Sequence, residues 1–248
     1  MSSLYSRDFI VTLIIVLIPL CLALNTDSYG QRIMTLSGIY AIAAMGYHLI
    51  FGRLGALSLA QGCFFGLGAY SAGLIGVHFE LSFLTCLLFA VIFTALVALI
   101  IALPVLRLES HYFALATLGI AQVALLIAIN WTEVTGGANG TYGIPQLDLF
   151  GMELSSSNHV LIFVWIILVI IVSLTFWIMR APFNYQVTLL KDTPEVAASS
   201  GIDIGRWRLT FFIMSAIFGA TAGALQAYTI GVVSPATLEF QVMVSILA

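Results

Sequence analysis

The sequence is poor in charge. Only 8% of its 248 residues are Asp, Glu, Lys or Arg, whereas a soluble domain carries about a quarter charged residues. The eight basic and eleven acidic residues give a formal net charge of −3. The chain therefore lacks the positive field that gripping a nucleic-acid backbone requires. Water is not its main solvent, and nucleic acid is excluded as a partner.

Cysteine is scarce, and catalytic motifs are absent from the sequence. Cys21, Cys63 and Cys86 lie within apolar runs without CxxC or His-rich spacing. This indicates small buried packing residues rather than a disulfide framework or a metal site. There is no GxxxxGKS/T phosphate loop, no HExxH, no GxSxG and no pair of carboxylates within an apolar run. We therefore predict that the chain is not an enzyme and holds no metal or cofactor.

Long apolar runs dominate what is present, because 61% of the residues are hydrophobic. Several runs reach about 20 residues, which is enough for a helix to cross a roughly 30 Å hydrocarbon core. We predict an all-α, polytopic transmembrane bundle that forms a single domain over residues 1–248. The expected spans are 8–24, 33–51, 57–78, 81–106, 111–131, 158–179 and 209–231.

The basic residues predict the orientation of these spans. If the N-terminus is cytoplasmic, seven of the eight basic residues face the cytoplasm, and only Arg32 lies outside. This is a strong positive-inside bias. The longest outer loop, 132–157, contains no Lys or Arg. The seven inner residues are Arg7, Arg53, Arg107, Arg180, Lys191, Arg206 and Arg208.

A last apolar stretch begins around Phe240, shortly before the sequence stops at Ala248. So short a stretch cannot span a membrane, and a chain that ended there would leave backbone carbonyls unsatisfied at membrane depth. We therefore expect the start of an eighth span and a natural chain that continues further.

Few polar residues lie within the expected spans. Residues 52–76 are rich in glycine, and Gly62 with Gly66 forms a GxxxG pair of the kind that lets helices approach closely. A second such pair, Gly219 and Gly223, lies in the last complete span. The polar residues nearby either join helices or face a path for a polar solute, and both interpretations stay open. The candidate path residues are Ser58, Gln61, Tyr70, Thr117 and Gln122.

The inner loop at 180–208 is too polar to span a membrane and too short to form a domain. Asp192 and Thr193 suit the cap of a helix that begins at Pro194, and Gly201 suits its end. We expect about two turns of helix on the cytoplasmic face. Its exposed small residues would fit the groove of another protein, although an ordinary surface helix is the alternative. These residues are Ala197, Ala198, Ser199 and Ser200.

Several motifs together resemble a known family. Glu195, Val196 and Ala197, followed after three residues by Gly201, resemble the EAA-x-x-x-G loop with which ABC importer permeases dock on their ATPases. LPVLRLESHYFALATLG at 103–119 and NWTEVTGGANGTYGIP at 130–145 resemble segments of LivM-type permeases of branched-chain amino acid importers. The similarity extends to GALSLAQGCFFGLGAYSAG at 55–73 and to the dipeptide of Ser234 and Pro235.

The resemblance implies an ABC importer permease, of type II-like architecture, in a bacterial inner membrane. Expected partners are two cytoplasmic ATPases that bind ATP and Mg, a LivH-like sister permease and a periplasmic substrate-binding protein. The residues implied to contact the ATPase are Pro194, Glu195, Ala197, Ala198 and Gly201.

The substrate and the energy source remain open at this stage. Branched-chain or other aliphatic amino acids are the expected cargo, and urea or short amides are the alternative within related importers. A stand-alone channel or a secondary carrier is an alternative of another class, and transport without any ATPase would identify it.

Overall fold

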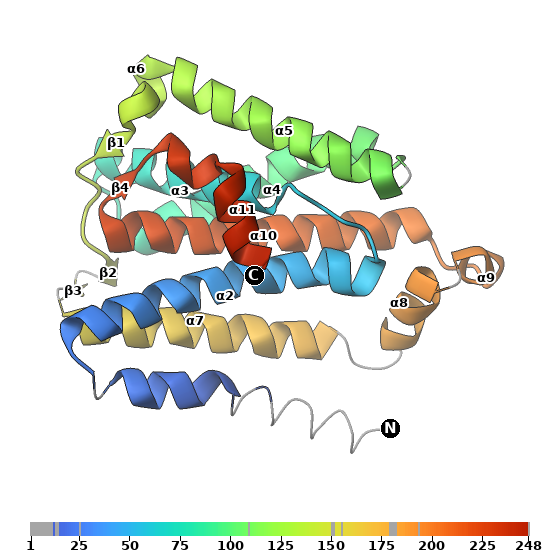
Figure 1. Ribbon diagram of the computed structural model, residues 1–248, viewed down its shortest axis with the longest axis horizontal. Coiled ribbons are helices and arrows are strands. Elements are labelled where there is room, and N and C mark those ends of the chain that lie inside the picture. The colour runs from blue at the N-terminus through green and yellow to red at the C-terminus, as the bar shows by residue number, and fades with distance from the viewer. Residues whose placement is uncertain are drawn as a thin grey trace.

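Long helices that run side by side make up most of the molecule (Figure 1). The computed structural model describes residues 12, 15–24, 26–108, 110–149, 152–154, 156–178, 183–192 and 194–247. Six of its helices are long and apolar enough to cross a membrane, and they confirm six of the expected spans. They are α2 (Ser28–Leu54), α3 (Gln61–Phe79), α4 (Phe83–Val105), α5 (Ser110–Asn130), α7 (Ser157–Ile178) and α10 (Ile204–Ile230).

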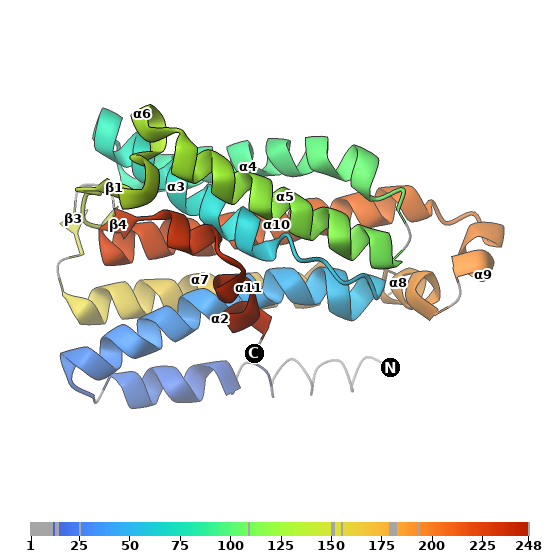
Figure 2. The same cartoon turned by 45° about the horizontal axis from the view of Figure 1, so that its top comes forward.

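The first expected span, 8–24, falls largely outside the described residues, although residues 15–23 are helical. Cys21 in this segment is exposed, which corrects the expectation of three buried cysteines. The segment lies at the edge of the bundle (Figure 2). Cys63 and Cys86 are buried as expected.

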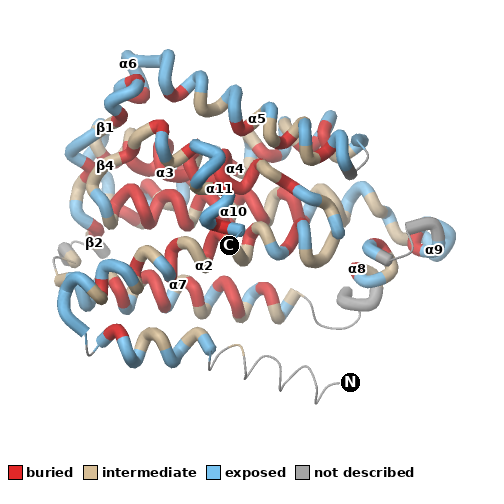
Figure 3. Tube along the Cα trace, viewed as in Figure 1, coloured by how far each residue is buried: buried red, intermediate tan, exposed pale blue. Residues whose placement is uncertain are grey.

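The most buried helices are not the most hydrophobic ones. α3 and α10 have the largest buried shares among the six spans, yet α4, α5 and α7 exceed both in hydropathy. Figure 3 shows the buried residues concentrated along α3 and α10 in the middle of the bundle. Helices at the periphery face lipid and need apolar side chains there, whereas central helices pack through small and weakly polar residues.

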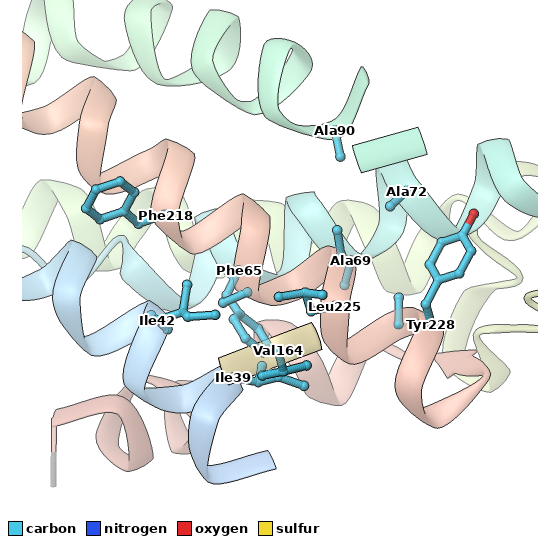
Figure 4. Packing of buried hydrophobic residues seen from close by; sticks show 14 of the residues in the cluster. Ile39, Ile42, Phe65, Ala69, Ala72, Ala90, Val164, Phe218, Leu225 and Tyr228 are labelled. Atoms are coloured by element: carbon cyan, nitrogen blue, oxygen red, sulfur yellow. The ribbon is translucent and has the colours of Figure 1, made fainter. Parts of the chain in front are cut away.

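The core forms where α2, α3 and α10 meet (Figure 4). Phe65 of α3, Leu225 of α10 and Ile42 of α2 are all fully buried in one cluster. α3 and α10 approach so closely that a Cβ on Gly68 would collide with the backbone of Ala220, and one on Gly223 would collide with the carbonyl of Phe65. The Gly219 and Gly223 pair is thus confirmed as a close helix contact.

The connections lie at the two ends of the bundle. At the first end, which we call the basic end, α2, α4 and α7 finish and α3, α5 and α10 begin. This end carries Arg53, Arg107, Lys191, Arg206 and Arg208, whereas Arg32 lies in the second turn of α2 toward the opposite end. The segregation matches the expected bias, while the cytoplasmic orientation of the basic end stays a prediction.

The opposite end is a folded cap rather than the plain loop expected over 132–157. It contains α6 (Thr132–Thr135), η1 (Gly137–Asn139) and the strands β1 (Thr141–Tyr142), β2 (Asp148–Leu149) and β3 (Met152–Glu153). β2 pairs with β3, and β1 pairs antiparallel with β4 (Val232–Val233), which follows α10. Asp148 Oδ1 accepts a 2.7 Å hydrogen bond from the amide of Phe83 at the start of α4.

After β4 the chain folds back into the bundle. The short helix η2 (Pro235–Leu238) and then α11 (Phe240–Leu247) pack against α2 and α3. In both ribbon views α11 lies midway along the bundle (Figures 1 and 2). A Cβ on Gly66 would meet the side chain of Leu238, and one on Gly62 would lie 3.3 Å from Cβ of Met243. The Gly62 and Gly66 pair therefore receives this returning segment.

Candidate functional site

Two short helices extend beyond the spans at the basic end (Figure 1): α8 (Phe183–Asp192) and α9 (Pro194–Ser199). The predicted helix does begin at Pro194. Gly201, with φ of +78°, ends it in a left-handed conformation. The amide of Ile202 donates to the carbonyl of Ala197, and the amide of Gly201 donates to that of Ala198, both at 3.1 Å. This pattern is a Schellman motif, which fixes how the helix ends.

Two features of this segment differ from expectation. The sequence predicted one helix, but α8 is a second one, with Val187 and Leu190 buried three residues apart on one face. Ala197 is fully buried rather than exposed, while Ala198, Ser199 and Ser200 are exposed. The side chains of Pro194 and Glu195, and all of Thr193, lie outside the described part of the chain.

Lys191 connects α8 to the first span of the core. Its Nζ donates a 3.0 Å hydrogen bond to the carbonyl of Gly52 in the last turn of α2. A cation at this position satisfies a carbonyl that the helix leaves free and complements the negative end of the helix dipole. Sequence reasoning missed this contact, because nothing local to either residue indicates a partner so far along the chain.

The segment between α2 and α3 is not helical until Gln61, although we predicted a helix from residue 57. Gly55 ends α2 with φ of +67°. The Ser58 hydroxyl, which is buried, accepts a 3.4 Å bond from the amide of Ala60, and such local bonding competes with the helix. The amide of Leu59 donates to Thr117 Oγ1 of α5 at 3.0 Å. Thr117 thus joins this connector to α5.

Gln61 lies at the centre of a buried polar cluster that joins three helices. Its Nε2 donates to the carbonyl of Ala43 in α2 at 2.9 Å and to that of Ser215 in α10 at 3.4 Å. The Ser215 hydroxyl donates back to Gln61 Oε1 at 2.6 Å. Gly46 leaves the necessary space, because a Cβ there would collide with the Gln61 amide.

The other two candidates occupy different surroundings. Tyr70 is 6% exposed, and its hydroxyl has no hydrogen-bond partner among the described residues. Gln122 lies near the middle of α5 and is exposed. The structure therefore does not gather the five candidates into one site. A role for them in a solute path stays a prediction.

The described residues also line two cavities, one toward each end of the bundle. The cavity at the basic end has a volume of about 320 Å³. The one at the opposite end has a volume of about 360 Å³. Its polar lining residues are Arg32, Thr35, Gln146, Ser157, Tyr228 and Thr229, and the others are apolar side chains and Gly231. None of the five candidate path residues lines either cavity.

A bundle of helices of spanning length, with glycine-packed central helices and a short helical pair beyond one end, is the architecture of a multi-pass membrane protein. The chain belongs to the family described as branched-chain amino acid transport system, permease component, whose model matches residues 29–248. No solved structure matches the chain significantly.

Two curated relatives are both named as LivM permease proteins. The chain is similar to the high-affinity branched-chain amino acid transport system permease protein LivM of Salmonella typhimurium strain LT2, with 30% identity over 270 residues. That alignment covers 100% of this chain and 63% of the relative. The corresponding LivM of Escherichia coli strain K12 is 32% identical over 239 residues, covering 87% of this chain and 56% of the relative. The chain thus spans less than two thirds of either relative.

Proposed function

We propose that this chain is the permease subunit of an ATP-driven importer, which carries branched-chain or other aliphatic amino acids across a bacterial inner membrane by alternating access. The proposed partners are two cytoplasmic ATPases that bind ATP and Mg, a LivH-like sister permease and a periplasmic binding protein. The family membership supports the substrate class. The observation that carries the coupling to ATP is the link from α8 and α9 into the core.

The link is a series of direct contacts that starts at α9. α9 packs on α8 and on the start of α10. Lys191, near the end of α8, holds the carbonyl of Gly52 at the end of α2. The connector that follows α2 is held in turn by Thr117 of α5. A displacement of α9 by an ATPase would therefore reach α2, α5 and α10. Such a series of contacts suits an element with two discrete arrangements.

The proposed solute path follows the exposed face of α5. Tyr112, Leu115, Gly119, Gln122 and Leu126 recur at three- and four-residue spacing, and all are exposed. This spacing places them on one helix face. Beyond the adjoining backbone of its own helix, no atom of the described residues lies within 4 Å of a Cβ built on Gly119. A primary amide at mid-span is poorly satisfied by lipid tails, so Gln122 faces water or a second permease when the importer is assembled.

The two glutamines provide a matched test of structural and path roles. Gln61→Leu removes the acceptor of the Ser215 hydroxyl and the bonds from the Gln61 amide to α2 and α10, so we expect a loss of about 2 kcal/mol of stability and a lower Tm. Gln122→Leu removes an exposed amide, so we expect an unchanged Tm and reduced uptake. Thermal unfolding in detergent and uptake into vesicles measure the two effects. Equal behaviour of the two variants would contradict this division.

ATP-dependent uptake of labelled leucine and labelled urea tests the function itself. Vesicles would contain the full-length chain, its co-expressed partners and the binding protein. We expect leucine uptake that requires ATP. Urea uptake in its place would retain the importer and overturn the substrate, whereas flux without ATP or ATPase subunits would overturn the proposal.

A further inference from the structure

The cavity at the basic end combines positive charge with an apolar lining. It lies where the ends of α2 and α4 meet the starts of α5 and α10. Two arginines, Arg107 and Arg208, line it. The rest of the lining is apolar side chains and the backbone of one glycine: Ile50, Leu54, Gly55, Ala56, Leu106, Leu108, Phe113 and Phe212.

Neither guanidinium is neutralised within the part of the chain that the structure describes. Arg206, two residues before Arg208, pairs with Asp203 at 2.9 Å. No such ion pair joins Arg107 or Arg208 to any described carboxylate. Two guanidinium groups that pair with no carboxylate among the described residues, beside an apolar surface, are suited to an oxyanion, because the planar donors match phosphate and carboxylate oxygens.

The surface beside the cavity favours a ligand that also carries an apolar chain. Leu96, Ile100 and Leu103 are spaced four and three residues apart, so they follow one face of α4 toward the cavity, which Arg107 lines two residues beyond the end of this helix. The three apolar residues are 56%, 69% and 59% exposed. A soluble anion would not contact this face, whereas the acyl chain of a lipid would lie along it.

The position of the cavity along the bundle gives the same indication. Because the helices that form it are of spanning length, we expect their ends to lie where the hydrocarbon core gives way to the headgroup region. The basic end is the one that the distribution of Lys and Arg assigns to the cytoplasmic leaflet, which is rich in anionic lipid. The geometry points to a site for the phosphate of one anionic phospholipid, held by Arg107 and Arg208.

Lipid retention tests this site. The purified chain would be reconstituted in nanodiscs of phosphatidylcholine with phosphatidylglycerol and transferred to mild detergent, and the retained lipids would be measured by mass spectrometry. We expect phosphatidylglycerol to be retained in preference to phosphatidylcholine. Arg107→Gln and Arg208→Gln should each weaken its binding about tenfold, since each removes a charge-assisted contact.

Arg206→Gln is the matched control, because it removes the same charge at the same end from a side chain that does not line the cavity. It should retain phosphatidylglycerol as the parent chain does. Arg107 is exposed, so Arg107→Gln keeps the test valid if Arg208→Gln fails to fold. Equal retention in all variants would overturn the proposal. The proposal would also be overturned if millimolar inorganic phosphate raised the Tm of the chain as much as phosphatidylglycerol does, because the site would then bind a free anion.

Discussion

Replacing Ala198 with tryptophan should abolish ATP-driven uptake while the chain stays folded. Ala198 is exposed on α9, and the Schellman motif at Gly201 fixes the orientation of this helix. An indole at this position would fill the groove into which we propose that α9 docks, and overpacking a close interface costs about 1–3 kcal/mol or more. We expect uptake to fall by at least about tenfold, since 1.4 kcal/mol corresponds to that factor. Vesicle uptake and ATPase co-purification measure the effect.

Thr210→Trp provides the control for this substitution. Thr210 is exposed in the second turn of α10, so the variant adds the same bulk near the basic end but on α10 rather than on α9. It should assemble and transport normally. Normal uptake and normal ATPase co-purification in Ala198→Trp would contradict the proposed docking. Ala197→Trp is unsuitable as a test, because Ala197 is fully buried and its replacement would disrupt α9 itself.

The spans could be predicted from the sequence because the membrane imposes a simple requirement. A spanning helix must satisfy its own backbone and offer apolar side chains over about 20 residues. This requirement is local, so α4 and α7 agree with the predicted spans within two residues at each end. α2 extends beyond its predicted span 33–51 at both ends, and α10 begins five residues before its predicted start at residue 209, because the extra turns are polar and hydropathy does not detect them.

The candidate site was less predictable because its contacts are distant in sequence. Glycine spacing indicated that residues 62 and 66 approach a neighbour closely, but it could not identify the returning η2 and α11 as that neighbour. In the same way, the Lys191 bond to Gly52 and the Thr117 bond to Leu59 have no local signal. Sequence reasoning missed α8, because its apolar residues form only a short stripe on one face of the helix.

The burial of Ala197 shows a further limit of sequence patterns. Ala197 and Ala198 are adjacent alanines in one helix, so the residue type does not distinguish them. Successive residues in a helix point about 100° apart, so only the packing of α9 on α8 and α10 decides which one is buried. A surface formed from small residues therefore requires the structure before its contact face can be assigned.

Gly223→Ala should produce the largest loss of stability of any single-methyl change considered for this chain. The added Cβ would collide with the carbonyl oxygen of Phe65 and lie 2.8 Å from its carbon and 2.9 Å from the amide nitrogen of Ala69. These are backbone atoms of α3, so no side-chain rotation relieves the collision, and α3 and α10 must separate. We expect a loss of about 3 kcal/mol and a fall in Tm on the order of 10 °C.

Gly119→Ala is the matched control, since it makes the same change in another spanning helix. In the part of the chain that the structure describes, no atom beyond the adjoining helix backbone lies within 4 Å of the Cβ that would be added there. Alanine is favoured over glycine in a helix by about 1 kcal/mol. The Tm of this variant should be unchanged or slightly higher. Fluorescence-detected thermal unfolding of both variants in the same detergent would therefore separate a close backbone contact from a general intolerance of spanning glycines. Equal Tm values for the two variants would show that α3 and α10 do not depend on this contact.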